Sequence, residues 1–294
     1  MPASSITVIA DAGPRVGLGH LSRAGAVAAA LRVQGHEVLT RTLGGGAVEH
    51  DGIAWMAHDG VAADGPVLVD AYGADLAALG GGRPVATFWD GAGDPPAGAA
   101  LAITPGGPGG DDDGVRWACL RPMFWGGGAP RPVAEVARRV LVTTGGGAAG
   151  GAGALAAAVR DAAAATPAGA EVALLLGPYA TEEPPDGVEV VRAPERMVDV
   201  LQAADVVVSA AGQTMLEALC AGTPCVALAV VDNQRAQLRR VGDAVRAAQD
   251  VAGAAAATAA LLGDAAARRA LAGAGRELVD GFGALRVAAK VAAL

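Results

Sequence analysis

Short apolar runs alternate with longer alanine-rich stretches along most of the chain. Near the N-terminus, an apolar run at residues 6–10 precedes a glycine-rich turn, an apolar stretch at 21–33 and a second run at 36–42. This order predicts a strand, a helix and a second strand, which is the βαβ start of a parallel sheet covered by helices. Further strands are expected at residues 66–70, 85–89 and 101–104.

A glycine- and proline-rich segment at residues 125–132 separates this pattern from a second one of the same kind. After it we expect a strand at 140–144, a glycine-rich loop at 145–151 and a helix at 152–165. The remaining strands are expected at residues 172–176, 188–191, 206–209 and 225–229, and the remaining helices at 197–203, 214–221, 234–241 and in the alanine-rich tail.

The repeated pattern predicts an α/β protein with two Rossmann-like, doubly wound domains that face each other across a cleft. We expect the first domain at residues 1–130 and the second at 131–294, with the C-terminal helix able to pack back against the first. Ligands of such sheets bind at the carboxyl ends of the strands, so candidate functional residues are expected there.

Composition narrows the classes of ligand. Hydrophobic residues make up 52% of the 294 residues but aromatic residues only 3%, so Ala, Val and Leu must build the core. The formal net charge is -8 and no Lys/Arg cluster stands out, which argues against nucleic acid or an anionic membrane as a partner.

The 3 cysteines and 4 histidines follow no disulfide or zinc spacing, so we expect neither a metal nor a cofactor. Without a signal peptide or an apolar span of membrane length, we expect a cytoplasmic protein, monomeric by default, that binds a small molecule.

The segment Gly-Leu-Gly-His-Leu-Ser-Arg at 17–23 follows the first predicted strand. Gly17 and Gly19 let the backbone approach a ligand, and the start of the next helix favours an anion, so both glycines and Arg23 are candidate ligand-binding residues. His20 would lie at that helix start, where an imidazole suits a general base near neutral pH. A dinucleotide fingerprint without its third glycine and a structural histidine in a tight turn remain open alternatives.

Polar residues also follow two later strands of the first half. Asp70 and Tyr72 stand where the third predicted strand ends, so both are expected at the carboxyl edge of the first sheet. Asp70 could orient the His20 ring or a substrate hydroxyl and Tyr72 could hydrogen-bond a sugar, so we group these three as candidate catalytic residues. The alternative is that Asp70 caps the next helix, and Asp90, one strand later, is open to the same two interpretations.

A glycine-rich loop follows the first strand of the second half. The backbone amides of Gly145 and Gly146 could bind phosphate oxygens, because exposed amides of such loops form anion-binding concavities. The loop is not a Walker motif, since no Gly-Lys-Ser or Gly-Lys-Thr follows it. A flexible turn in a glycine-rich chain is the alternative.

The strongest pattern is the segment 204–226, an apolar strand that ends in small residues before a helix starting near Thr214. The first amides of that helix would face a phosphate, and Glu217, one turn in, could accept hydrogen bonds from both ribose hydroxyls. The candidate ligand-binding residues here are Ala211, Gly212, Gln213, Thr214 and Glu217, joined by Asn233 and Gln234 at the start of the following helix. The alternative is a capping box formed by Thr214 and Glu217 without a ligand.

Together and in this order, from residue 6 to about 237, these segments resemble the GT-B nucleotide-sugar enzymes, which include the MurG-type glycosyltransferases. The resemblance is closer to the PseG/SpsG-type UDP-sugar hydrolases. The segment Leu-Arg-Pro-Met-Phe at 120–124 and the pair Asn233-Gln234 favour that branch.

The resemblance implies that the second domain holds UDP and the first holds the sugar. The phosphates would meet Gly145, Gly146, Gly212, Gln213 and Thr214, the ribose Glu217, and the uracil the loop at 193–197. His20 would act on a water that attacks the anomeric carbon, with UDP as the leaving group and no metal involved.

We therefore expect a hydrolase that releases UDP and a free, modified amino or deoxy sugar. The first alternative is a GT-B glycosyltransferase that uses a UDP-sugar donor, in which the same base activates an acceptor hydroxyl. The second is a non-catalytic protein that binds a nucleotide sugar. A dehydrogenase is disfavoured, because the third glycine and the ribose-binding acid of its fingerprint are missing.

Overall fold

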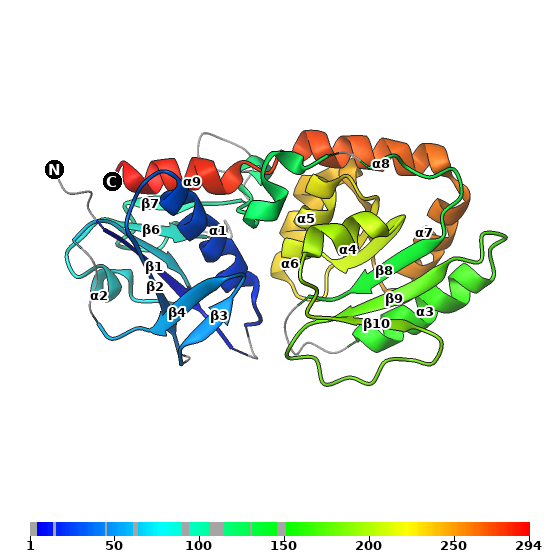
Figure 1. The fold of residues 1–294 in the computed structure, drawn as a ribbon, viewed down its shortest axis with the longest axis horizontal. Helices are drawn as coiled ribbons and strands as arrows, with labels where there is room; N and C mark the ends of the chain where they lie inside the picture. The colour runs from blue at the N-terminus through cyan, green and yellow to red at the C-terminus, as the bar shows by residue number, and fades with distance from the viewer. Residues whose placement is uncertain are drawn as a thin grey trace. The chain divides into compact units, whose positions relative to one another are not determined.

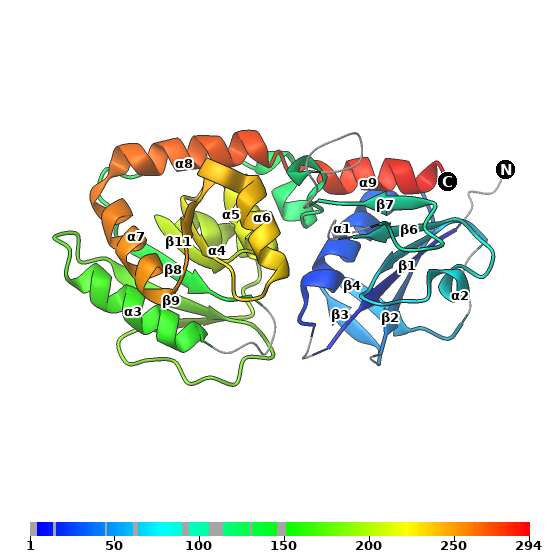
Figure 2. The ribbon, with the colours of Figure 1, turned by 180° about the vertical axis from the view of Figure 1, so that it is seen from behind.

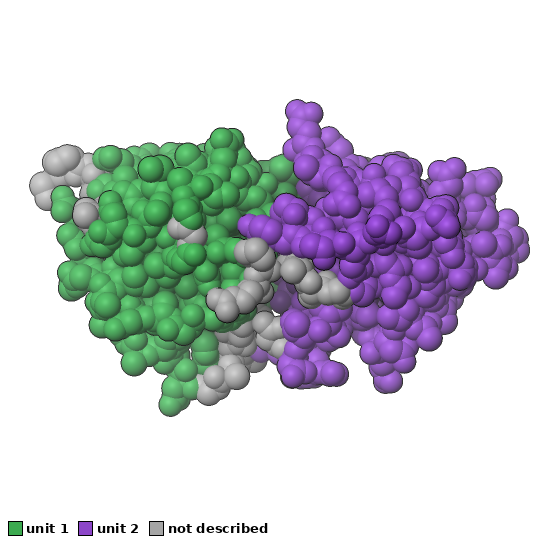
Figure 3. All heavy atoms as spheres, turned by 90° about the horizontal axis from the view of Figure 1, so that it is seen from below, with its two compact units in different colours: residues 1–125, 281–294 green, residues 126–280 purple. Residues whose placement is uncertain are grey.

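The computed structural model describes residues 5–13, 16–44, 46–60, 64–89, 94–105, 114–129, 131–145 and 151–294. The chain divides into two compact units, which Figure 3 colours separately. Unit 1 consists of Met1–Trp125 and Gly281–Leu294, and unit 2 of Gly126–Asp280. Each unit contains its own sheet and its own hydrophobic core.

Unit 1 is built on a sheet whose described strands run in the order β3-β4-β2-β1-β5-β6-β7 (Figure 1). The strands are β1 (Ile6–Asp11), β2 (Val38–Leu43), β3 (Val48–His50), β4 (Ile53–Ala57), β5 (Val67–Asp70), β6 (Val85–Phe88) and β7 (Leu101–Ile103). The helices are α1 (Gly19–Val33), α2 (Leu76–Gly80) and α9 (Gly283–Ala292), with short 3-10 helices at Val115–Trp117 and Pro122–Gly127. Neighbouring strands are parallel except β3 and β4.

The topological switch point of unit 1 lies between β1 and β5. From β1 the chain builds outward through β2 and β4 on one side, and then returns to build through β5, β6 and β7 on the other. This is the Rossmann strand order, and its ligands bind at the carboxyl ends of the two central strands. Ala10 pairs with Asp70 in register, so the residues that follow β1 and β5 meet at this edge.

The strands β3 and β4 form a hairpin that the hydrophobic pattern did not predict. Its turn residues Asp51 and Gly52 have φ angles of 52° and 71°. Two successive positive φ values are the signature of a type I′ turn, which Asp-Gly favours and which matches the twist of paired strands. The hairpin buries Trp55 at 1% exposure and extends the sheet at its edge.

Unit 2 repeats the Rossmann order as β10-β9-β8-β11-β12-β13, with every neighbouring pair parallel. The strands β8, β9 and β11 of this sheet are labelled in Figure 2. Its strands are β8 (Arg139–Thr143), β9 (Glu171–Leu176), β10 (Glu189–Arg192), β11 (Val206–Ala210), β12 (Cys225–Leu228) and β13 (Arg246–Ala248). Its helices are α3 (Ala152–Ala164), α4 (Met197–Ala203), α5 (Gln213–Ala221), α6 (Asn233–Val241), α7 (Val251–Gly263) and α8 (Ala265–Leu278), with a 3-10 turn at Gly242–Ala244. The switch point lies between β8 and β11, where Thr143 pairs with Ser209.

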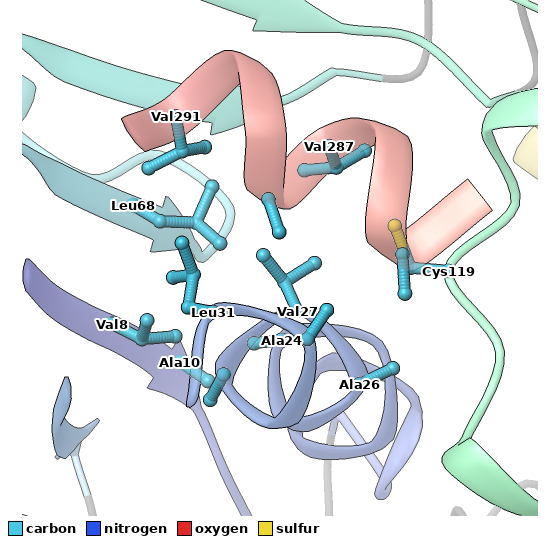
Figure 4. Close-up of a cluster of buried hydrophobic side chains, with 14 of the residues drawn as sticks. Val8, Ala10, Ala24, Ala26, Val27, Leu31, Leu68, Cys119, Val287 and Val291 are labelled. Atoms are coloured by element: carbon cyan, nitrogen blue, oxygen red, sulfur yellow. The ribbon is translucent and has the colours of Figure 1, made fainter. Parts of the chain in front are cut away.

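The core of unit 1 explains why α1 is apolar on nearly every side. One side of α1 packs on β1 and β5, and another packs on α9. In Figure 4, Val27 and Leu31 of α1 point toward Val287 and Val291 of α9, beside Leu68 of β5. The segment after residue 280 therefore completes the core that the first 125 residues begin.

The predicted fold class, two Rossmann-like α/β domains with parallel sheets, is confirmed. The helix α1 begins at Gly19 rather than at residue 21, which places His20 inside its first turn. The elements that the pattern missed are the hairpin β3–β4, the short helix α2, the strand β13 and the three short 3-10 helices. Within the described parts of the chain, none of the helices is long and apolar enough to cross a membrane.

Candidate active site

A histidine and an aspartate are paired at the switch point of unit 1. His20 lies in the first turn of α1 and Asp70 is the last residue of β5. His20 Nδ1 is 2.6 Å from Asp70 Oδ1, and the two residues are 6% and 1% exposed. The structure thus brings these two predicted catalytic residues into direct contact. Such a pair can hold an imidazole in one orientation while its second nitrogen accepts a proton.

The charge state of Asp70 follows from its neighbours. Burial alone would raise the pKa of the Asp70 carboxyl, but the charge of Arg23 and the hydrogen bonds from Arg23 and His20 outweigh it and lower that pKa to about 2. Asp70 is therefore ionised near neutral pH and can only accept hydrogen bonds. His20 Nδ1 must then be the donor, so in the neutral ring Nε2 carries the lone pair.

Tyr72, the third predicted catalytic residue, lies against the His20 ring. The two ring centroids are 4.7 Å apart and the planes meet at 87°, an edge-on contact. Tyr72 is 58% exposed whereas His20 is 6% exposed. Tyr72 is thus the most exposed of the three predicted catalytic residues, and it contacts His20 through edge-on packing of the two rings.

Arg23 also contacts Asp70, although it was predicted to bind the ligand. Arg23 Nε donates to Asp70 Oδ2 at 2.8 Å, and Nη2 donates to Oδ1 at 2.6 Å. The guanidinium carbon lies 4.5 Å from the centre of the Phe88 ring, a cation–π contact. Asp90, beyond β6, lies outside the described residues.

A second polar cluster, which the sequence pattern did not indicate, lies beside the first on α1. Ser22 Oγ is 2.8 Å from His50 Nε2, which is 3.1 Å from Asp51 Oδ2. Arg121 Nη1 donates to Asp51 Oδ1 at 3.2 Å, and its guanidinium carbon lies 5.7 Å from the centre of the Phe124 ring. These contacts tie the β3–β4 hairpin to α1 and to the segment 120–124.

The predicted glycines of the first motif shape the turn that leads into α1. Gly17 has a φ of 74° and donates its amide to the carbonyl of Gly13 at 2.9 Å. A side chain at Gly17 would be strained at this φ, so glycine suits the turn. Gly19 is the first residue of α1, and a Cβ built on it would meet open space.

In unit 2, the start of α5 lies at the switch point. Ala211 is buried, and Gly212 serves as the N-cap of a helix whose first residues are Gln213 and Thr214. The first amides of a helix have no acceptor within it and carry a partial positive charge, so this end suits an anion. Thr214 is not the N-cap, so the capping-box interpretation of Thr214 and Glu217 is wrong.

Two further predicted residues lie close to this helix start. Gln234 Oε1 accepts from the amide of Val230 at 2.9 Å, and its Nε2 lies 3.7 Å from where a Cβ would stand on Gly212. Glu217 is only 1% exposed, so its carboxylate can reach a ribose only if neighbouring side chains shift. Asn233 begins α6, and its side chain lies outside what the structure describes.

The glycine loop after β8 leads to the start of α3, where a carboxylate already binds the backbone amides. Gly145 has a φ of 103° and donates its amide to Thr143 Oγ1 at 3.3 Å. Gly146 lies outside the described residues. At the start of α3, beyond this loop, the Glu182 carboxylate accepts hydrogen bonds from the amides of Gly151 and Gly153. A carboxylate thus already occupies an end of α3 where a phosphate would otherwise be favoured.

Among the described residues, no group of three or more His, Cys, Asp and Glu side chains is arranged to hold a metal ion. The cysteines Cys119, Cys220 and Cys225 are buried and form no disulfide. Burial is the largest influence on each, and it raises the pKa of Cys220 to about 11 and that of Cys225 to about 12. These thiols are therefore poor nucleophiles near neutral pH.

Comparison with known proteins gives a fold but no family. No protein-family model matches the sequence, and no curated protein matches it either. Similar solved structures include the glycotransferase of kitacinnamycin, with 18% identity, a TM-score of 0.67 and 99% of each chain covered. Acinetobacter baumannii MurG has 17% identity, a TM-score of 0.60 and complete coverage of both chains at 100%. The Streptomyces sp. SF2575 glycosyltransferase SsfS6, complexed with thymidine diphosphate, has 18% identity, a TM-score of 0.63, and 98% of this chain and 99% of that chain covered.

These likenesses extend over essentially the whole chain, so the two-domain architecture is that of GT-B glycosyltransferases. At such low identity they show the fold alone. The chemistry must be argued from the residues at the two switch points.

Proposed function

We propose that this protein is an enzyme that transfers a glycosyl group from a nucleoside-diphosphate sugar to an acceptor hydroxyl, with His20 as the general base. The observation that carries the proposal is the 2.6 Å contact between His20 Nδ1 and Asp70 Oδ1 at the switch point of unit 1. The GT-B fold supports it, because the similar structures named above are glycosyltransferases.

The proposed reaction is a displacement at the anomeric carbon. The acceptor oxygen forms a bond to that carbon while the bond from the carbon to the diphosphate oxygen breaks. The electron pair of the broken bond stays on the nucleoside diphosphate, and the acceptor proton moves to His20 Nε2. Asp70 remains ionised, holds the Nδ1 proton and stabilises the imidazolium that forms.

The donor is assigned to unit 2 on the basis of the helix start at Gly212. The backbone amides around Gln213 and Thr214 would donate hydrogen bonds to the diphosphate oxygens, and the side-chain amide of Gln234 beside Gly212 would donate further ones. Positive partial charge at a helix N-terminus stabilises the charge that develops on a leaving diphosphate. In this proposal, unit 1 provides the acceptor side and unit 2 the donor side.

We propose UDP as the donor nucleotide, with Glu217 accepting hydrogen bonds from the ribose. Thymidine diphosphate is a second nucleotide to test, since the similar structure SsfS6 was solved in complex with it. Thymidine lacks the 2′-hydroxyl, so a carboxylate that reads both ribose hydroxyls would favour UDP. Substitution of Glu217 by Gln separates the two cases through its effect on each nucleotide.

Hydrolysis by the same residues is the second candidate, and the segment 120–124 favours it through the resemblance stated above. Water would replace the acceptor, and His20 would take its proton. In the structure Arg121 of this segment pairs with Asp51 and stacks near Phe124. The segment is thus occupied in packing unit 1, which weakens its use as a marker of hydrolysis.

The test is to measure release of UDP and dTDP from a panel of their sugars, with and without a panel of hydroxyl-bearing acceptors. The glycosyltransferase predicts release that depends on an acceptor, with a new glycoside as product. Equal release in water alone would favour the hydrolase. Nucleotide binding without release under any condition would contradict both and leave a binding protein.

A further inference from the structure

Both oxygens of the Asp70 carboxylate are held by Arg23. Nε binds Oδ2 at 2.8 Å, while Nη2 binds Oδ1 at 2.6 Å, the same oxygen that His20 Nδ1 reaches. The Arg23 side chain is 19% exposed, and its guanidinium group also lies over the Phe88 ring. The guanidinium plane is thus fixed by a carboxylate and an aromatic face.

We propose that Arg23 is a positioning residue that acts on His20 through Asp70, rather than a ligand of the donor phosphates. This inference rests on the proposed role of His20 as the base. A planar, two-point contact stops the carboxylate from turning away from the imidazole, which one hydrogen bond alone would allow. The ring is then held with its proton on Nδ1 and its lone pair on Nε2.

Asp70 must also stay ionised if His20 is to act as the base through Nε2. Asp70 is 1% exposed, and an isolated carboxylate at such a position would tend to become neutral. A neutral Asp70 would donate a proton toward Nδ1, and the imidazole proton would then lie on Nε2, where it blocks the base. The charge and hydrogen bonds of Arg23 oppose the effect of burial on the pKa of Asp70.

The groups that face Asp70 come from three parts of unit 1. His20 and Arg23 project from α1, and Tyr72 follows β5 and contacts the His20 ring. Cys119, from the segment before Leu120, also interacts electrostatically with Asp70 and Arg23, but burial raises the pKa of its thiol and keeps it neutral. Arg23 is therefore the group among these that keeps a positive charge over the whole working pH range.

The first experiment needs no substrate. In full-length protein with ¹³C-labelled aspartate, the Asp70 carboxyl carbon is followed by NMR as the pH is lowered, in the wild type, R23Q and R23K. We expect Asp70 to stay ionised down to about pH 4 in the wild type and in R23K, where a cation remains. In R23Q its titration midpoint should rise by about one unit or more, because burial remains and the opposing charge is gone.

The second experiment separates positioning from ligand binding. We expect R23Q to lower kcat by about tenfold or more and to move the acid limb of the pH–rate profile to higher pH, while the Kd for UDP changes less than about twofold. R23K should recover the ionisation of Asp70 but only part of kcat, because an ammonium group cannot hold both oxygens in one plane.

Two results would contradict the positioning role of Arg23, and a third would contradict the proposed function on which that role rests. An Asp70 titration unchanged in R23Q would overturn it, and so would a tenfold weaker Kd for UDP at unchanged kcat in R23Q or R23K. If R23Q does not fold, R23K takes its place in the test. A lower kcat with an unchanged Kd for UDP then supports the positioning role. A wild type without turnover would overturn the proposed function, and the Asp70 titration would still decide the role of Arg23.

Discussion

The carboxylate of Asp70 lies 2.6 Å from Nδ1 of His20, although the two residues are 50 positions apart in the sequence. They meet because β1 and β5 are neighbours in the sheet, with Ala10 in register with Asp70. The helix that follows β1 then carries His20 to the end of β5. This arrangement lies at the switch point, where doubly wound sheets bind their ligands.

Replacing Asp70 by Asn should lower kcat by about 10²–10⁴-fold, because an amide can donate to Nδ1 and shift the imidazole proton to Nε2. H20Q should cost a similar factor. The double variant should be little worse than either single one, since the pair acts as a unit. Steady-state rates of all three test this.

The matched control for D70N is D59N. Asp59 also follows a strand of the same sheet, but its side chain is 59% exposed and its Oδ1 lies 3.9 Å from Arg41 Nε. We expect D59N to retain wild-type kcat. Equal losses in D59N and D70N would contradict a specific role for Asp70.

Asp70 should also make the stability of the protein depend on pH. Its pKa is lowered from 3.8 to about 2 in the folded state, so its contribution is complete above about pH 5 and is lost as the pH falls toward 2. The contribution near neutral pH is on the order of 2 kcal/mol. Urea unfolding of the wild type and D70N at several pH values should show a difference that shrinks below about pH 4. A difference independent of pH would contradict the assignment.

Two glycine substitutions should change stability in opposite directions. A Cβ on Gly283, at the start of α9, would lie 2.1 Å from the carbonyl oxygen of Ala118, so G283A must move α9 away from the segment that contains Ala118. We expect a loss of about 1–3 kcal/mol. A Cβ on Gly273, inside α8, meets nothing within 4 Å, so G273A should gain up to about 1 kcal/mol. Thermal unfolding of both variants provides the comparison, and a loss in G273A would contradict it.

Glu182 distinguishes two candidate phosphate sites. Its carboxylate accepts from the amides of Gly151 and Gly153 at the start of α3. If the diphosphate binds at the start of α5, E182A should cost about 1 kcal/mol of stability and change the Kd for UDP by less than about threefold. Titration calorimetry measures that Kd. Tenfold tighter UDP binding in E182A would instead place the diphosphate at α3.

Hydrophobic periodicity was sufficient to predict the two parallel sheets, because strands buried on both faces are continuous apolar runs. It missed the β3–β4 hairpin, although Asp51-Gly52 between alternating apolar residues was a usable turn signal. The helix α2 and the strand β13 are too short to show a period.

The candidate site could be predicted only in part, because only some of its contacts follow from the order of the strands. The positions of His20 and Asp70 at strand ends follow from chain order, and neighbouring strands brought them together. The partners of Arg23 and Ser22 did not follow, because Asp70 and His50 are 47 and 28 residues away and nothing local selects them. The Glu182 contact with α3 is likewise set by tertiary packing.

The role of His20 as the base is tested by comparing the wild type, H20Q and H36Q for sugar transfer from a UDP- or dTDP-sugar and for binding of the free nucleotide. His36 lies just before β2, at the opposite end of the strands from His20, so H36Q is the matched control. We predict that H20Q loses turnover by at least about a hundredfold while its nucleotide Kd is unchanged, and that H36Q behaves as the wild type. Turnover by H20Q at the wild-type rate would rule out His20 as the general base.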